Sequence, residues 1–270
     1  MATVYKEGMR DLDIIKRIQK IVGCYPDGIW GPKTTAAVKA WQRVHSLKDD
    51  GIVGPATLAK MGLTSPTPAP SLVRGVDIID GFINTHITFC VGRALKYIAI
   101  HYTAGSTSKA GTALATRNVF LNRLASADFV VDDEQIVQIN PDIKNYYCWA
   151  VGDAKNSSPG GARLYGKATN KNTISIEICS NLFCGATAAV PNHSGWFFTD
   201  AALQNTTRLV RHLMKTYNIP KENVVRHYDI SGKLCPGLPG WNDAYLYTSD
   251  GKPTKEKNNS KEWEKFWKGI

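Results

Sequence analysis

An alternating proline segment divides this chain into two parts. Residues 65–71 read Ser-Pro-Thr-Pro-Ala-Pro-Ser, and a segment of this kind is extended and semi-rigid, with a reach of roughly 20 Å at about 3.1 Å per residue. A length of 270 residues fits two domains. We therefore predict a small domain at 1–64, a linker at 65–71 and a larger domain at 72–270, which are tethered rather than fused.

The N-terminal part contains an internal repeat. The sequence DGIWGP at 27–32 recurs as DGIVGP at 50–55. In each copy Asp-Gly supplies a turn, and the proline stands at the first position of a helix, where its missing N–H costs nothing. The apolar spacing predicts helices around 12–22 and 38–44 and a short helix at 55–61.

The two copies of the repeat together resemble the three-helix peptidoglycan-binding module, over about residues 6–62. The resemblance implies that this part of the chain binds bacterial cell wall, with Asp27, Trp30 and Asp50 as expected wall-binding residues. The alternative is a small helical dimerisation domain.

The second part carries a pattern typical of a zinc site at 226–237, RHYDISGKLCPG. It places the imidazole of His227, the ammonium of Lys233 and the thiol of Cys235 within nine residues, beside a predicted strand end. Histidine and cysteine are ligands that zinc prefers, and a catalytic site takes three protein ligands. We expect the third from His101, which follows a buried-strand pattern of β-branched and aromatic residues.

A carboxylate stands in the middle of another apolar run, ISIEIC at 174–179. Burying Glu177 in a sheet is expensive unless it meets a charge or a metal. On strand alternation, Glu177 shares a face with Ser175 and Cys179, while the three isoleucines point the other way. We predict that one face of this strand is core and that the other carries the chemistry.

Three motifs, in this order, resemble the zinc-dependent N-acetylmuramoyl-L-alanine amidases of the phage-lysozyme and peptidoglycan-recognition type. They are IAIHYTAG at 98–105, NTISIEICSN at 172–181 and VVRHYDISGKLCPG at 224–237. The resemblance covers roughly residues 75–240, most of the second domain. It implies an amidase that cuts the bond between the lactyl group of N-acetylmuramic acid and L-alanine by zinc-activated water.

The same resemblance implies roles for individual side chains. His101, His227 and Cys235 would bind one Zn²⁺ per chain, Glu177 would be the acid/base, and Lys233 would steady the oxyanion. Taken singly, His101 could be a satisfied core or surface group, Cys235 a buried thiol and Lys233 an ordinary surface lysine.

The chain departs from the family before the strand at 129–132, where relatives commonly carry an aromatic residue followed by histidine. It has Ser126-Ala127-Asp128 there, so members with a glutamate in the IEI strand are the better match. We expect substrate contacts from Tyr102, Asp128 and Trp149, although Trp149 could instead pack in the core. Asp229 either orients His227 or caps the following turn.

The second domain is predicted to be α/β, with a mixed central β-sheet flanked by helices on both faces. The expected strands lie near 96–102, 128–132, 135–140, 173–179 and 223–227, and the expected helices near 110–124 and 199–217. Thr199 is the expected N-cap of the longer helix, with His212 facing solvent. The segment 241–259 is expected to be loop, followed by a helix that Ser260 opens and that docks through Trp263 and Trp267.

The net charge of +10 suits an anionic partner, which could be nucleic acid or a wall rich in carboxylates and phosphates. Because no recognised nucleic-acid motif accompanies the charge, we expect peptidoglycan and not nucleic acid. Once one of the six cysteines binds metal, five remain, and a complete disulfide set is impossible, as expected in a reducing compartment. We expect Cys179 and Cys184 to be core thiols.

No apolar signal-peptide region lies between Met1 and Asp13, and no run of 18 apolar residues occurs anywhere. We therefore expect no signal peptide and no membrane insertion. The pattern resembles phage endolysins, which accumulate in the host cytoplasm and reach the wall through a holin. Two alternatives remain: a non-catalytic peptidoglycan-recognition protein, which generally lacks the zinc cysteine, and a peptidase that cuts within the stem peptide.

Overall fold

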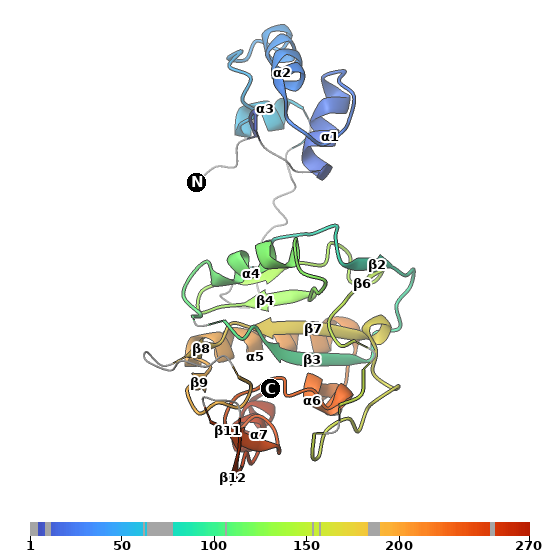
Figure 1. Ribbon diagram of the computed structural model, residues 1–270. Helices are drawn as coiled ribbons and strands as arrows, with labels where there is room; N and C mark the ends of the chain where they lie inside the picture. Colours follow the sequence, from blue (N-terminus) through green and yellow to red (C-terminus); the bar gives the residue numbers. More distant parts are fainter. Residues whose placement is uncertain are drawn as a thin grey trace. The chain divides into compact units, whose positions relative to one another are not determined.

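The chain divides into two compact units, 1–69 and 70–270 (Figure 1). The computed structural model describes residues 5–8, 12–61, 63, 78–105, 107–152, 154–156, 158–182, 190–248 and 252–270. The proline-rich segment 65–71 and Cys184 lie outside the described residues. Within the described part, no helix is both long enough and apolar enough to cross a membrane.

The N-terminal unit has the predicted helices: α1 (Leu12–Ile21), α2 (Pro32–Val44) and α3 (Pro55–Lys60). Proline stands at the start of α2 and of α3, as the repeat indicates. The core of the unit is built from the fully buried Ile15, Ile18, Val38 and Val53, packed around Trp30.

In each copy of the repeat, the side chain of a buried glutamine forms hydrogen bonds with the turn and with the helix that follows it. The Gln19 side chain donates to Asp27 Oδ1, Ile29 O and Thr34 Oγ1 at 2.7, 3.0 and 3.1 Å and accepts from Gly28 N at 2.8 Å. Gln42 repeats this pattern in the second copy, with Asp50, Ile52, Thr57 and Gly51 as its partners. The repeat is therefore a repeated hydrogen-bond network as well as a repeated turn.

This network corrects part of the wall-binding prediction. Trp30 is only 1% exposed and donates from its indole to Thr35, so it is a core residue and not a contact surface. The carboxylates of Asp27 and Asp50 accept bonds from the backbone N–H two residues later, which makes them turn residues. Sequence spacing alone does not distinguish a tryptophan that contacts a ligand from one that fills a small core.

The C-terminal unit is built on a six-stranded mixed sheet, as predicted, in the order β1-β5-β4-β7-β3-β10. The antiparallel pair is β4–β5, and the other neighbours are parallel. The strands are β1 (Ile78–Asp80), β3 (Tyr97–Tyr102), β4 (Phe129–Val131), β5 (Ile136–Gln138), β7 (Thr173–Ile178) and β10 (Val224–Arg226).

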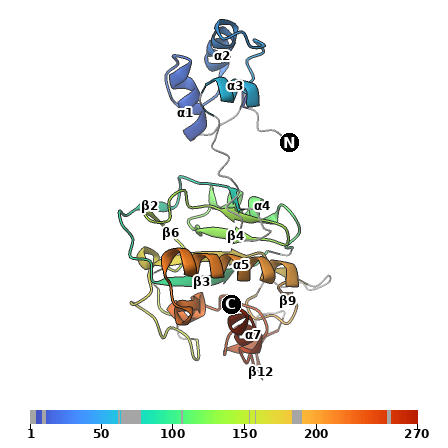
Figure 2. The same cartoon turned by 180° about the vertical axis from the view of Figure 1, so that it is seen from behind.

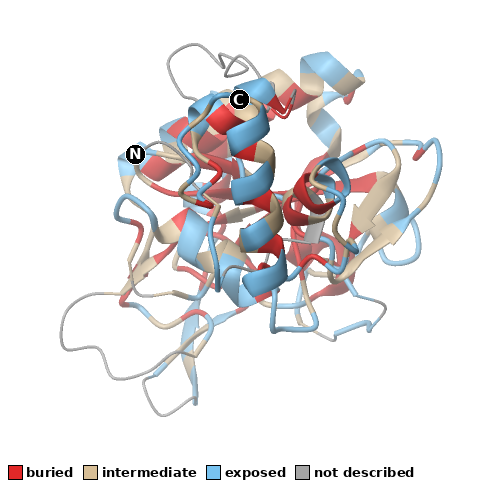
Figure 3. Cartoon of the chain, turned by 90° about the horizontal axis from the view of Figure 1, so that it is seen from above, coloured by how far each residue is buried: buried red, intermediate tan, exposed pale blue. Residues whose placement is uncertain are grey.

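Helices cover both faces of this sheet (Figures 1 and 2). On one face, α5 (Asp200–Tyr217) packs on the isoleucines of β3 and β7, and α7 (Lys261–Gly269) joins the same core through Trp263 and Phe266. On the other face lie α4 (Thr112–Phe120) and the short α6 (His227–Ser231). Figure 3 shows buried residues along one side of the helices and exposed residues along the other.

Several local predictions for these helices are confirmed. The Thr199 side chain caps α5 by accepting from Ala202 N, and α7 begins after Ser260. Trp263 is 8% exposed and packs on the main core, with Trp267 partly buried beside it. Cys179 is a buried free thiol, as expected.

The prediction that His212 faces solvent is only partly correct. The residue is half-buried, and its ring lies 3.4 Å from Thr216 Oγ1.

Three two-stranded sheets and two short 3-10 helices complete the described fold. The segment 241–259 is not all loop, because an antiparallel pair forms from β11 (Tyr245–Tyr247) and β12 (Pro253–Lys257). The residues of β12 are mostly exposed and polar, so they leave no apolar alternation to predict from. The others are β2 (Ile87–Phe89) with β6 (Tyr146–Cys148), β8 (Asn181–Leu182) with β9 (Trp196–Phe197), η1 (Asn170–Asn172) and η2 (Lys221–Asn223).

Candidate active site

Adjacent parallel strands place His101 and Glu177 side by side. The two residues are register partners, His101 at the end of β3 and Glu177 near the end of β7. Their alternate neighbours, Ile100 and Ile176, belong to the core under α5. Both functional side chains therefore project from the opposite face, where α4 and α6 lie.

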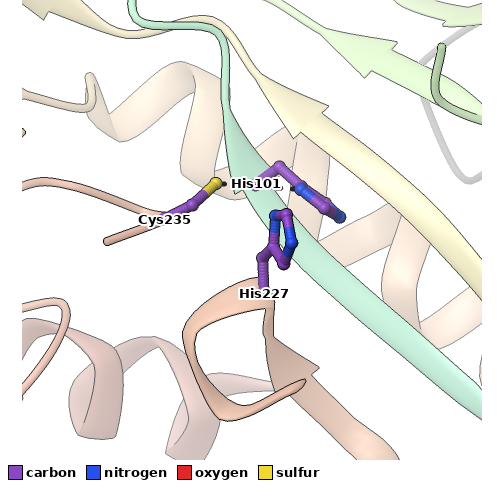
Figure 4. A group of neighbouring side chains, drawn as sticks. All are labelled: His101, His227 and Cys235. Carbon is purple, nitrogen blue, oxygen red and sulfur yellow. Dashed lines mark hydrogen bonds between the residues drawn. The ribbon is translucent and has the colours of Figure 1, made fainter. Parts of the chain in front are cut away.

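His227 and Cys235 complete a group of three residues able to hold a metal ion (Figure 4). His227 begins α6 directly after β10, and Cys235 follows the turn at Gly232. One ligand atom from each of His101, His227 and Cys235 lies within 4.8 Å of the other two, and all three side chains are buried. Cys235 Sγ lies 3.7 Å from His101 Nδ1.

Gly232 allows the chain to turn from α6 toward Cys235. It has φ of +78°, in the left-handed region, and a Cβ at this position would collide with the carbonyl oxygen of Asn156. Glycine is the residue that adopts this conformation without steric cost. The close spacing of His227, Lys233 and Cys235 in the sequence thus becomes a compact site.

The protonation states and free ring nitrogens of the two histidines are suited to binding a metal ion. His227 Nε2 donates to the carbonyl of Val151 at 2.9 Å, which leaves Nδ1 as the free lone pair, and that buried atom has no partner. His101 Nε2 is likewise buried without a partner. Burial, together with Lys233, lowers the pKa of His227 to about 4, and burial and His227 lower the pKa of His101. Both imidazoles are therefore neutral at pH 7, as ligation requires.

Unlike the two imidazoles, the side chain of Cys235 must lose a proton before it can bind a metal ion. Burial raises the pKa of its thiol, and the Glu177 carboxylate acts in the same direction. The charge of Lys233 acts in the opposite direction, and a metal ion at the sulfur would favour the thiolate further. The thiol is thus expensive to ionise unless it serves as a ligand.

Glu177 presents an unpaired carboxylate oxygen beside this group. Its Oε2 is buried and has no hydrogen-bond partner. Burial raises the pKa of Glu177 to about 8, while the charges of Lys233 and Arg123 act in the opposite direction. A carboxyl group whose pKa lies near neutrality is suited to accept and release a proton.

One cavity, of about 620 Å³, contains these groups. It is lined by the three candidate ligands and by Glu177, with Lys233, Arg123 and Trp149 also facing it. Lys233 is exposed, so its ammonium is available to a molecule in the cavity.

The family of this chain follows from comparison with known proteins. The family model described as N-acetylmuramoyl-L-alanine amidase matches residues 91–238, more than half of the chain. The chain belongs to the N-acetylmuramoyl-L-alanine amidase family. A second model, for a peptidoglycan binding domain, matches residues 16–61.

The amidase-family chain is similar to two Bacillus subtilis (strain 168) proteins. It is 34% identical to the N-acetylmuramoyl-L-alanine amidase CwlH over 172 residues, which cover 62% of this chain and 58% of CwlH. It is 32% identical to the amidase XlyA over 167 residues, which cover 60% of this chain and 46% of XlyA. The chain thus spans about half the length of these curated relatives. The solved catalytic domain of XlyA aligns at a TM-score of 0.48, with 27% identity, over 72% of this chain and 99% of that one.

Two of the expected substrate contacts of the amidase-family chain differ in exposure. Trp149 is 41% exposed, faces the cavity and is held by a 2.8 Å bond from its indole to Thr88. Tyr102 also borders the cavity, but its ring is 9% exposed and packs edge-on against Trp196 in the core. Trp149 is therefore the side chain able to stack on a ligand.

The prediction that Asp128 contacts substrate is wrong. Asp128 is fully buried and lies away from the cavity. It pairs with Arg93 at 3.4 Å and accepts from Ser175 N and Asn140 Nδ2 at 2.8 and 2.6 Å. A buried charge requires such partners, so Asp128 stabilises the start of β4 beside β7 and does not touch substrate.

Asp229 does not orient His227. Its carboxylate accepts three bonds from Arg226, from the backbone N–H, Nε and Nη2, at 2.8 to 3.0 Å. It therefore caps the start of α6 and not the turn that follows. The carbonyl of Val151 is the partner that orients His227.

Arg123 is a cavity residue that the sequence motifs do not reveal. It follows α4, is exposed, and makes no side-chain hydrogen bond or ion pair with the described residues, yet its charge acts on Glu177. The signal available in the sequence, a basic residue after a predicted helix, is too common to indicate a site.

Proposed function

We propose that this protein is a peptidoglycan hydrolase of the endolysin type. It cleaves the amide bond between N-acetylmuramic acid and L-alanine of the stem peptide. The observation that carries the proposal is the convergence of His101, His227, Cys235 and Glu177 on one cavity in a chain of the amidase family.

His101, His227 and Cys235 are proposed to hold one zinc ion per chain through two neutral imidazoles and a thiolate. Bound there, zinc would supply Lewis-acid polarisation of the scissile carbonyl and would lower the pKa of water. The chemistry of the donor set supports this assignment, because soft sulfur and imidazole nitrogen are typical zinc ligands. The bond from His227 to Val151 fixes the tautomer of that imidazole.

Glu177 is proposed as the general base and acid. Its unpartnered Oε2 accepts a proton from the attacking water and then delivers it to the nitrogen of the departing L-alanine. The protonated carboxyl is accessible near neutral pH because burial raises its pKa. This two-way role requires a group that exists in both protonation states during turnover.

Lys233 is proposed to stabilise the negative charge that develops on the carbonyl oxygen. Its exposed ammonium lines the same cavity as Glu177. A preorganised donor at a developing oxyanion lowers the barrier by a few kcal/mol in typical enzymes. Trp149 is proposed to contact the substrate through its exposed ring.

Residues 1–64 are proposed to bind peptidoglycan, in support of which the peptidoglycan binding domain model matches 16–61. Residues 72–270 are proposed as the catalytic domain, and 65–71 as the tether. A tether raises the effective concentration of the catalytic domain near bound wall.

Digestion of purified peptidoglycan tests the proposed reaction. We expect new N-terminal L-alanine and no new reducing ends. A stem-peptide peptidase would release other amino termini, and a non-catalytic recognition protein would release none. Either result would overturn the proposal.

The cellular route stays a prediction from composition: accumulation in the host cytoplasm and holin-dependent access to the wall. Expression in a susceptible bacterium with and without a holin tests it. We expect lysis only when both proteins are made.

A further inference from the structure

A second cavity, of about 560 Å³, lies between α5 and α7. Helix α5 packs on the sheet face opposite to the one that carries His101 and Glu177, and α7 packs beside α5 in the same core. The two cavities have no lining residue in common. We call the second one the α5–α7 groove, and Figure 2 shows the two helices that form it.

The groove has an aromatic floor. Trp196, Trp241 and Phe266 line it and are otherwise buried, and Phe198 meets Trp241 edge-on at 4.8 Å. Leu203, from α5, is half-buried and adds an apolar wall. An apolar pocket with a few charged groups around its rim is the usual form of a ligand site.

Acidic and basic residues line different parts of the groove. Arg211 of α5 donates to the carbonyl of Gly269 at the end of α7. One turn before these two contacting residues, Arg208 of α5 and Lys265 of α7 also line the groove. Toward the N-terminal ends of both helices, the lining residues are acidic: Asp200 on α5 and Glu262 on α7.

In the described part of the chain, none of these four charged side chains is paired with a group of opposite charge. Among the described residues, Asp200, Arg208, Glu262 and Lys265 form no salt bridge and no side-chain hydrogen bond. The eight-residue step from Asp200 to Arg208 corresponds to about 12 Å along the helix at 1.5 Å per residue. Along α5, the groove thus has an acidic residue, Asp200, and a basic residue, Arg208, separated along its aromatic floor.

We propose that the α5–α7 groove binds a short zwitterionic peptide, with its amine at Asp200 and a carboxylate at Arg208 and Lys265. A span of about 12 Å matches three to four residues of extended peptide. Stem peptides of peptidoglycan carry both an amine and carboxylates, and naming them as the source rests on the proposed function. The groove is then a second wall contact, separate from the reaction.

A peptide titration tests this assignment on the full chain. The probe is L-alanyl-γ-D-glutamyl-L-lysyl-D-alanine, which lacks the muramoyl amide bond and is not cleaved by the proposed reaction. Backbone amide NMR should show shifts along 203–211 and 265–269. Reversal of both cations, Arg208→Glu with Lys265→Glu, should weaken this binding by about tenfold or more, because complementary charges set the orientation. Asp200→Lys should weaken it independently.

The control is Lys215→Glu, which reverses the charge of one exposed cation of α5 outside the groove. It should leave binding within about twofold of the parent, since isolated surface charges contribute little. The assignment is overturned if the shifts fall only on the active-site cavity, or if Lys215→Glu weakens binding as much as the double variant. Because the titration requires no hydrolysis, failure of the proposed amidase activity would appear separately, as unchanged peptidoglycan.

Discussion

His101 and Glu177 are register partners on the adjacent parallel strands β3 and β7. Neighbouring strands lie about 4.8 Å apart, so a candidate metal ligand and a candidate proton carrier occupy one rigid two-strand unit. Their isoleucine neighbours anchor both strands in the same core on the opposite face. The position of the carboxylate relative to the ligand group is therefore fixed by backbone pairing rather than by a loop.

Replacement of Cys235 should remove metal and activity together. Cys235→Ser is expected to lose stoichiometric zinc, because a hydroxyl is a weak zinc ligand compared with a thiolate. Elemental analysis and the release of L-alanine amines measure the two effects. Cys90→Ser, a half-buried thiol outside the site, is the matched control and should retain both. A Cys235→Ser protein with one zinc per chain would show that the ligand assignment is wrong.

Replacement of Glu177 should affect turnover and leave metal binding intact. Glu177→Ala is expected to lower kcat by about 100-fold or more, the range that general acid–base catalysis contributes. Zinc content and sedimentation with peptidoglycan should not change, since the residue is neither a ligand nor a wall anchor. The exposed Glu134→Ala serves as control. Near-normal lysis by Glu177→Ala would exclude the proposed role.

Lys233→Ala should slow hydrolysis by about tenfold or more, because a cation near the developing oxyanion is lost. Its zinc content should equal that of the parent protein. Lys167→Ala, also exposed but outside the cavity, provides the comparison. Equal rates for the two variants would identify Lys233 as an ordinary surface lysine.

The two predicted domains should separate in function. Residues 1–64 alone should sediment with purified peptidoglycan and release nothing from it. Residues 72–270 alone should release L-alanine amines, more slowly on intact wall than on soluble muropeptides, because the tether is lost. If 1–64 does not bind wall and its deletion leaves activity on intact wall unchanged, the repeat is a structural or oligomerisation element.

The two glutamines of the repeat should contribute similarly to stability. Gln19→Ala and Gln42→Ala each leave buried backbone groups without partners, at an expected cost of about 1–3 kcal/mol in the free energy of unfolding. Denaturation of residues 1–64 measures it. Gln204→Ala, on the exposed side of α5, is a control made in residues 72–270 and should change stability by less than about 0.5 kcal/mol. An equally small effect at Gln42 would contradict the role of the network.

The strands that carry the site were predictable from sequence because their signals are local. β-branched residues and alternation mark β3 and β7, and the same alternation places Glu177 opposite to its isoleucine neighbours. Three motifs in order also indicated the family, and the proline and Asp-Gly signals located the helices of the first unit. Each of these signals is contained within a few consecutive residues.

Only the tertiary structure decided which polar and aromatic residues face a ligand. Asp128 pairs with Arg93, 35 residues away, and His227 bonds to Val151, 76 residues away, so neither role can be read from neighbouring positions. Trp30 and Trp149 are the same residue type, yet one fills a core and the other borders a cavity. The α5–α7 groove likewise exists only because two helices far apart in the chain pack against each other. Local sequence determines backbone conformation and side-chain alternation, whereas burial and partners depend on which distant segments meet.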